Sequence, residues 1–438
     1  MRIFAAHKPK FAQMTENKSP RIARMSAWLC RLGCLIAAMT ASLNLCARKQ
    51  SEGGSGVQYF FLNCADWQYG YRQLREEFGP QDGQRVRVGQ AAMFYIFERP
   101  MYTLVPELRE HLRQARQYHV PLLVELDPVT FCNAVPDLWN WWDPAYYGYD
   151  ERNRRNVEWT GWMPDSAVRV GWLNWGRQLR ITPMLNLYSP AYWRHVRYRM
   201  NVMLGIVSEW YNALPEDERW LLCGVKVTGE LAFGVNNWYF PGGNDLLDRP
   251  EADDPQLDMG QSMRIMPSRG AQTIGYAALS SSGIRRKGEI SARDIYRLEA
   301  RFQRDIGRLV RRSGFPREML FGHAGGCAGD LGSCLNRYVC PAWSFYNEDA
   351  HRPEEAGAMQ WLALSDAPYY AAAEFSLWEE PDPEKWKEAL LRHYAIPRCR
   401  YVALFTADGK FIPGSGAVEG IKRMQREMND AHRPRAIR

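Results

Sequence analysis

Several common signatures of function are missing from the 438-residue sequence. No glycine-rich phosphate fingerprint follows the first apolar run, so nothing favours a nucleotide-binding fold. Cys327, Cys334 and Cys340 lie close together in a glycine-rich segment, but they lack paired CxxC spacing, which disfavours a zinc site. In an oxidising compartment two of these cysteines can pair, and otherwise they are free thiols. No motif demands a metal or an organic cofactor, and we expect neither.

A charge excess is also missing once the N-terminal segment is set aside. The full chain carries 56 basic and 49 acidic residues. Residues 1–45 hold seven of the basic residues and one of the acids, which leaves 49 basic and 48 acidic residues. A nearly neutral domain lacks the positive footprint of a nucleic-acid-binding protein, so we expect no nucleic-acid partner.

The N-terminal segment has the pattern of an export signal. Basic residues up to Arg31 precede an apolar run from Leu32 to Leu45, which is too short to span a bilayer as a helix. The run ends in Leu43-Asn44-Leu45-Cys46, which resembles a bacterial lipoprotein lipobox. The resemblance implies a lipid on Cys46 and an exported cell-envelope lipoprotein, periplasmic or associated with the outer membrane, of a Gram-negative bacterium. The alternative is a leader in which Cys46 is incidental.

From residue 57 onward, short apolar runs alternate with amphipathic helical stretches, a pattern typical of βα units around a parallel sheet. The apolar runs show little alternation, as expected of strands covered on both faces. Eight such units fit one closed (β/α)8 TIM barrel, and an open doubly wound sheet is the alternative. The predicted strands are Val57–Asn63, Ala91–Phe97, Pro121–Leu126, Leu222–Thr228, Met319–His323, Ala342–Tyr346, Tyr370–Phe375 and Tyr401–Phe405. The predicted helices are Tyr102–Tyr118, Pro190–Leu214, Ala292–Ser313, Glu354–Leu364, Pro383–Tyr394 and Ala417–Met428.

Two strand-to-helix connections are far too long for plain loops. One runs from Asp127 to Ser189, after the third strand, and the other from Leu231 to about Ser291, after the fourth. Both leave the carboxyl ends of strands, where barrel enzymes carry their sites. The expected organisation is a leader over residues 1–46, a flexible linker over 47–56, a catalytic barrel over 57–430 and a basic tail over 431–438.

Two glutamates each close an apolar strand at this predicted face. Glu230 ends the run Leu-Cys-Gly-Val-Lys-Val-Thr-Gly-Glu, and Glu374 lies in Tyr-Tyr-Ala-Ala-Ala-Glu-Phe-Ser-Leu-Trp. A lone glutamate at a strand end is usually a solvated loop residue, but two of them on the fourth and seventh strands are harder to ascribe to chance. Cleavage of a glycosidic bond needs two carboxyl groups in opposite protonation states, one of them kept protonated by burial or a nearby like charge.

The positions of these glutamates resemble clan A of the retaining glycoside hydrolases. The resemblance covers the barrel from about Val57 to Met428 and implies that Glu230 is the acid/base and Glu374 the nucleophile. The chain departs from the clan at Gly229, where an Asn that binds the sugar 2-hydroxyl is usual.

Two local resemblances accompany this one. The segment from Asn186 to Trp193 is similar to the family 42 β-galactosidases, and Tyr346 stands where many clan members hold a Tyr against the nucleophile. Gly-Glu-Leu around Glu230, followed by Trp-Tyr-Phe-Pro-Gly from Trp238, is similar to the acid region of the β-amylases, which are inverting barrel enzymes. The sequence therefore leaves two stereochemical outcomes at the anomeric carbon, retention and inversion, and we favour retention.

Aromatic residues gather in the long connection after the third strand, since eight of the 17 Trp fall between Trp139 and Trp193. Sugars stack their C–H faces on flat rings, so such rings can build subsites; the other possibility is a small core beneath the loop. The candidates for contact with substrate are Asp127, Tyr346, Trp378, Arg99, His323, Asn347 and Trp238.

The sequence therefore predicts a glycoside hydrolase acting on an oligo- or polysaccharide, with the membrane a partner only through the lipid anchor. The competing hypothesis is a non-catalytic carbohydrate-binding lipoprotein on a degenerate barrel. Gly229 gives that hypothesis weight, whereas intact Glu230 and Glu374 oppose it. A structural surface protein would explain neither the strand-end acids nor the aromatic loop.

Overall fold

The computed structural model describes residues 58–63, 70–169, 171–174, 178–231, 273–325, 330–378, 380–405 and 413–430. Contacts divide the chain into two units, Met1–Ser55 and Gly56–Arg438, and every described residue belongs to the second. Cys46, Trp238 and Cys327 lie outside the described residues. Within those ranges, no helix is long and apolar enough to cross a membrane.

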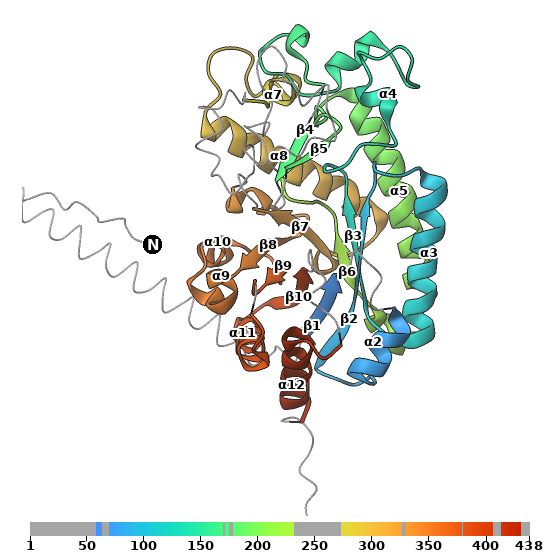
Figure 1. Ribbon diagram of the computed structural model, residues 1–438, viewed down its shortest axis with the longest axis vertical. Helices are drawn as coiled ribbons and strands as arrows, with labels where there is room; N and C mark the ends of the chain where they lie inside the picture. Colours follow the sequence, from blue (N-terminus) through green and yellow to red (C-terminus); the bar gives the residue numbers. More distant parts are fainter. Residues whose placement is uncertain are drawn as a thin grey trace, which may run out of the picture. The chain divides into compact units, whose positions relative to one another are not determined.

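Eight parallel strands close into a barrel (Figure 1). Their order around the ring is β1-β2-β3-β6-β7-β8-β9-β10, and β10 pairs with β1 to close it. Each strand predicted from the sequence is one of these eight, so the (β/α)8 prediction is confirmed and the open sheet is excluded. The strands are β1 (Gln58–Asn63), β2 (Val86–Tyr95), β3 (Leu122–Asp127), β6 (Leu222–Lys226), β7 (Leu320–Ala324), β8 (Cys340–Tyr346), β9 (Tyr370–Ser376) and β10 (Cys399–Phe405).

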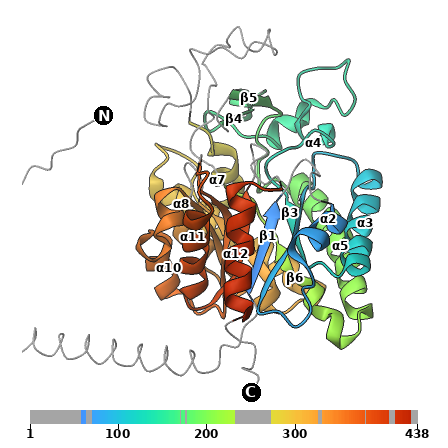
Figure 2. The same ribbon diagram turned by 60° about the horizontal axis from the view of Figure 1, so that its bottom comes forward.

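Helices cover the outside of the ring (Figure 2). The predicted helix over Glu354–Leu364 is interrupted, because a 3-10 turn over Pro353–Glu355 precedes a shorter helix, and α2 was not predicted. The other predicted helices are present with ends shifted by a few residues. The main helices are α2 (Tyr71–Phe78), α3 (Met101–Tyr118), α5 (Pro190–Ala213), α8 (Ala292–Val310), α10 (Ala358–Leu364), α11 (Pro383–Ala395) and α12 (Gly416–Asp430).

The barrel strands are buried on both faces, which explains their continuous apolar sequences. On β1, Phe60 and Leu62 belong to the core that lies between strands and helices, whereas Tyr59 and Phe61 belong to a second core that also contains Leu123 of β3. Successive residues of a strand point to opposite faces, so the second and fourth residues after an inward one point inward as well. Glu125 and Asp127 therefore follow Leu123 on the inner face and stand above an apolar floor.

The long connection after β3 carries α4 (Pro136–Trp139) and the hairpin of β4 (Gly171–Asn174) and β5 (Gln178–Ile181). Figure 1 shows these elements at the end of the barrel toward which β3 runs. Three of its tryptophans, Trp139, Trp141 and Trp159, are buried. For these three, the small core beneath the loop is confirmed.

Glu158 fastens this connection to the segment after β6. Its buried carboxylate accepts hydrogen bonds from the backbone N–H groups of Gly275, Ala277 and Ala278 at 2.9, 3.2 and 3.0 Å, at the start of α7 (Tyr276–Ser282). Burial raises the pKa of Glu158 to about 7, against the effect of these hydrogen bonds. The two long connections are thus joined by a side chain that caps a helix start.

Candidate active site

The barrel brings Glu230 and Glu374 together. Glu230 follows β6, the fourth strand of the ring, and Glu374 lies on β9, the seventh. One carboxylate oxygen of each and a ring nitrogen of His323 lie within 4.8 Å of one another. Two carboxyl groups and an imidazole thus converge near the carboxyl ends of strands, where the sequence predicted a site.

Each carboxylate receives a hydrogen bond from β8. Oγ of Ser344 donates to Oε1 of Glu230 at 2.6 Å, and the hydroxyl of Tyr346 donates to Oε2 of Glu374. Ser344 and Tyr346 are two residues apart on one strand, so their side chains point to the same face. The sequence prediction that Tyr346 stands against Glu374 agrees with this contact.

The proximity of the two carboxyl groups makes it costly to ionise both. Burial, and then the charge of Glu230, raises the pKa of Glu374 to about 8, while Lys226 and the hydroxyl of Tyr346 act in the opposite direction. Burial raises the pKa of Glu230 as well, and Ser344 and Lys226 oppose the rise. Like charges this close share a proton, so the pair as a whole carries one near neutral pH.

A buried ion pair lies on the neighbouring strands. Lys226 Nζ is 2.6 Å from Oε2 of Glu125, and both side chains are almost completely buried. The two residues face each other across β3 and β6 in the sheet register. Lys226 therefore supplies a fixed positive charge that lowers the pKa of both Glu230 and Glu374.

Asp127 explains the glycine that precedes Glu230. Its carboxylate accepts hydrogen bonds from the backbone N–H groups of Val129 and Thr130 and from the Thr130 hydroxyl, at 2.6, 3.1 and 2.5 Å. A Cβ added at Gly229 would overlap Oδ2 of Asp127 and lie 2.8 Å from its Cγ. An Asn at position 229 has no room here, because Asp127 occupies that space.

Trp378 and Asn347 lie next to Tyr346. The indole of Trp378 is 41% exposed and its ring centre is 5.6 Å from that of Tyr346. Oδ1 of Asn347 accepts a hydrogen bond from the Trp378 backbone N–H at 3.2 Å, so Asn347 holds the backbone that carries the indole. An exposed flat ring beside the acid pair suits the apolar face of a sugar.

Arg99 has a different setting. Its guanidinium is 2.6 Å from Oε2 of Glu107 on α3 and 4.0 Å from Glu98. These contacts join the end of β2 to the helix that follows, and no described contact links Arg99 to the acid pair. Cys334 and Cys340 are buried free thiols.

Reasoning from the sequence missed Ser344, Lys226 and Glu125. Lys226 and Glu125 had a usable signal, because a charge inside an apolar strand covered on both faces must be paired. Ser344 had none, because a serine within a strand is ordinary until its neighbours are known.

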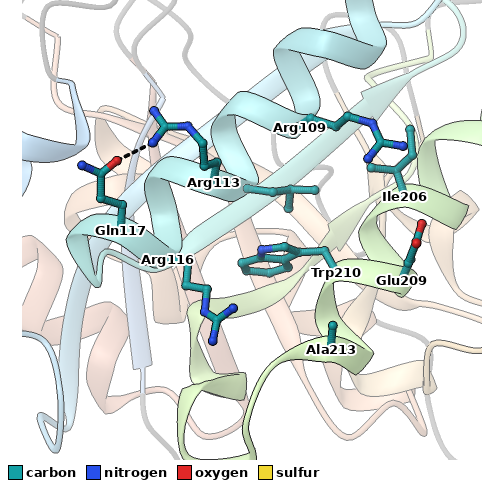
Figure 3. A pocket seen from close by; sticks show the side chains of 9 residues that line it. Arg109, Arg113, Arg116, Gln117, Ile206, Glu209, Trp210 and Ala213 are labelled. Carbon is teal, nitrogen blue, oxygen red and sulfur yellow. Dashed lines mark hydrogen bonds between the residues drawn. The ribbon is translucent and has the colours of Figure 1, made fainter.

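A separate cavity of about 550 Å³ lies on the outside of the barrel (Figure 3). Side chains of α3 and α5 line it, among them Arg109, Arg113 and Trp210. None of its lining residues belongs to the acid pair or its neighbours, so this cavity is distinct from the candidate site.

No protein-family model and no curated protein matches the sequence. Solved structures with a similar fold include a family 5 broad-specificity endoglucanase from an uncultured bacterium, with 9% identity, 82% and 83% of the two chains covered and a TM-score of 0.38. A glycoside hydrolase family 5 enzyme from Prevotella bryantii, in complex with a xyloglucan tetradecasaccharide, has 10% identity, coverage of 87% and 98%, and a TM-score of 0.40. A family 26 enzyme from a Muricauda species has 12% identity, coverage of 84% and 88%, and a TM-score of 0.37. Similarity this distant describes the fold and carries no information about the reaction.

Proposed function

We propose that the chain is a retaining glycoside hydrolase with Glu230 as acid/base and Glu374 as nucleophile. The observation that carries the proposal is the approach of two carboxylate oxygens, one from each residue, to within 4.8 Å inside a barrel. Retaining enzymes hold their two carboxyl groups about 5–5.5 Å apart, whereas inverting enzymes need about 6.5–9.5 Å to admit a water molecule. The β-amylase-like inverting alternative is therefore disfavoured.

The hydrogen bonds support this assignment of roles. Tyr346 donates to Glu374 and stabilises its ionised form, which the nucleophile must adopt. Glu230 has a side chain that is 28% exposed, so it can exchange a proton with water between the two steps. In the first step Glu374 attacks the anomeric carbon while Glu230 protonates the leaving oxygen. In the second step Glu230 takes a proton from water, which displaces the sugar from Glu374.

The surrounding residues suit a carbohydrate. Trp378 offers an exposed ring for stacking, and Asp127 offers a carboxylate beside Gly229 for a sugar hydroxyl. Tyr346 lies between the nucleophile and the indole. The proposed substrate is an oligo- or polysaccharide with one sugar ring against Trp378 and its anomeric carbon next to Glu374.

The test is hydrolysis of a panel of nitrophenyl glycosides, β-galactoside included, and of polysaccharides by the chain from Ser51 onward. Glu230→Gln and Glu374→Gln are measured beside the wild type, and proton NMR records the anomeric form of the first product. The proposal is supported if the wild type hydrolyses a glycoside with retention of the anomeric configuration and both variants lose this activity. An inverted product contradicts the assigned mechanism, and glycan binding without turnover would favour the non-catalytic binding protein.

We further propose that Cys46 anchors the protein to the cell envelope. The support is the sequence pattern of residues 32–46, which resembles a lipobox. Expression of the full chain in a Gram-negative host with labelled palmitate tests this. Incorporation that Cys46→Ala removes supports the anchor, and equal labelling or none in both proteins contradicts it.

A further inference from the structure

His323 reaches Glu230 through a second side chain. Its imidazole is fully buried on β7, and Nε2 lies 2.9 Å from Oγ of Ser344 on β8. Oγ of Ser344 in turn donates to Oε1 of Glu230 at 2.6 Å, whereas Nε2 and Oε1 are 3.7 Å apart. The last distance is too long for a hydrogen bond, so the imidazole acts on Glu230 by way of the hydroxyl.

The single hydrogen of the serine hydroxyl sets the direction of this chain. Because Ser344 donates it to Glu230, the hydrogen between His323 and Ser344 must come from Nε2 of the imidazole. The other tautomer would bury an N–H at Nδ1, which has no hydrogen-bond partner among the described residues, and a buried donor without a partner is costly. Burial and then the charge of Lys226 lower the pKa of His323 well below its ordinary value, so the ring is neutral.

Two hydrogen bonds hold the backbone of His323 in place. The His323 N–H donates to Oγ1 of Thr228 at 2.9 Å, and the side-chain amide of Gln303 donates to the His323 carbonyl. Thr228 and Gln303 are both buried. Thr228 also lies two residues before Glu230, so these bonds fix the backbone that carries the ring relative to the segment that follows β6.

We infer that His323, acting through Ser344, is a positioning residue that keeps Oε1 of Glu230 as a hydrogen-bond acceptor and leaves Oε2 to carry the transferable proton. The inference rests on the proposed function. In the first step the proton moves from Oε2 to the glycosidic oxygen as the C–O bond breaks and Glu374 bonds to the anomeric carbon. In the second step water gives a proton to Oε2 as its oxygen replaces Glu374. His323 and Ser344 keep their own hydrogens throughout.

Two leaving groups separate positioning of the acid from a general structural role. Dinitrophenolate departs without protonation, whereas methoxyphenolate needs an acid. The probes are 2,4-dinitrophenyl and 4-methoxyphenyl glycosides of the sugar that the wild type hydrolyses fastest. The variants are Ser344→Ala and His323→Leu, with His323→Gln to restore an N–H donor and Ser282→Ala as a control. Ser282 is a buried serine whose hydroxyl bonds only locally, to the Leu279 carbonyl.

We expect S344A and H323L to lower kcat/KM for the methoxyphenyl glycoside about tenfold or more, and for the dinitrophenyl glycoside less than about threefold. H323Q should recover most of the loss, and S282A should change neither substrate. The hydrogen bond from Ser344 lowers the pKa of Glu230, so its loss in S344A raises that pKa. The basic limb of the pH profile should therefore move to higher pH. Equal losses on both substrates, or no loss, overturn the inference.

Nitrogen-15 NMR of the imidazoles tests the same inference without activity. The chain has eight histidines, and the signal missing from H323Q identifies His323. The inference requires a neutral ring with its hydrogen on Nε2 in the wild type. A hydrogen on Nδ1, or a protonated ring at pH 6, overturns it. If this tautomer is found but no glycoside is cleaved, the proposed function has failed and the hydrogen-bond chain stands.

Discussion

The carboxylate of Asp127 occupies the space into which a side chain at position 229 would project. Asp127 is held there by three hydrogen bonds from Val129 and Thr130, so it has little freedom to move away. Gly229 is thus required by a close approach between β3 and the segment that leads to Glu230. A carboxylate from the neighbouring strand β3 therefore lies against the backbone of the residue that precedes Glu230.

Gly229→Ala should therefore disturb the site. The added Cβ overlaps Asp127, and overpacking of this kind costs about 1–3 kcal/mol in the free energy of unfolding. Gly205→Ala on the exposed side of α5 is the matched control, because its Cβ meets nothing within 4 Å and alanine favours a helix. Urea unfolding measures both. Stability of G229A equal to that of the wild type would contradict the packing account, and adding Asp127→Ala to G229A should recover part of the loss.

Tyr346→Phe should shift the acidic limb of the pH–rate profile upward. The tyrosine hydroxyl lowers the pKa of Glu374, so its loss raises that pKa and delays ionisation of the nucleophile to higher pH. The measurement is kcat/KM against pH for an activated aryl glycoside. Tyr188→Phe is the control, since its hydroxyl bonds to Asp305 at 3.2 Å, away from the acid pair. A shift of the same size in Y188F, or a downward shift in Y346F, would count against the assigned roles.

Lys226→Met should lower both stability and activity, for different reasons. It leaves the charge of Glu125 buried without a partner, which costs roughly 3–5 kcal/mol. It also removes a positive charge that lowers the pKa of Glu230 and Glu374, so both limbs of the pH profile move to higher pH. The double variant E125M/K226M should regain most of the stability and keep the shift of the basic limb, with a smaller shift of the acidic limb because Glu125 raises the pKa of Glu374. A normal profile in the double variant would show that Lys226 has only a structural role.

Glu374→Gln should stabilise the fold at alkaline pH. The pKa of Glu374 rises from 4.5 to about 8 in the folded protein, so between these values the folded state binds more protons than the unfolded state. Stability from this group is therefore complete below about pH 4.5 and falls as the pH rises toward 8. Glutamine does not titrate, so the gain in melting temperature of E374Q over wild type should be larger at pH 8.5 than at pH 5. An equal difference at both pH values would contradict this.

The barrel was readable from the sequence because parallel strands buried on both faces appear as short apolar runs. Strand ends were less clear: β2 begins at Val86, where Arg87 and Gln90 interrupt the apolar pattern, and the prediction began only at Ala91. Helix α2 was not predicted because it has only about two turns and few apolar residues. Its buried residues are Tyr71, Leu74 and Phe78.

The candidate site was readable only in part. Glu230 and Glu374 are strand-end acids and leave a local signal. Ser344 leaves none, because its role depends on the placement of β8 beside β7, close to the residues that follow β6, and on the direction of a single hydroxyl. Predicting the Lys226–Glu125 pair would have required the register of β3 against β6. The sequences of two short strands do not determine their register when a long insertion separates them.

The identity of the nucleophile is the most direct test of the proposed mechanism. The protein is incubated with a 2-deoxy-2-fluoro glycoside that carries a good leaving group, which slows the second step and traps the sugar on the enzyme. Peptide mass spectrometry then locates the adduct. We predict one sugar on the peptide that contains Glu374, at its carboxylate, and no adduct in E374Q. Labelling of another residue, or turnover of the natural glycoside with no adduct at any residue, would contradict the retaining pair of Glu230 and Glu374.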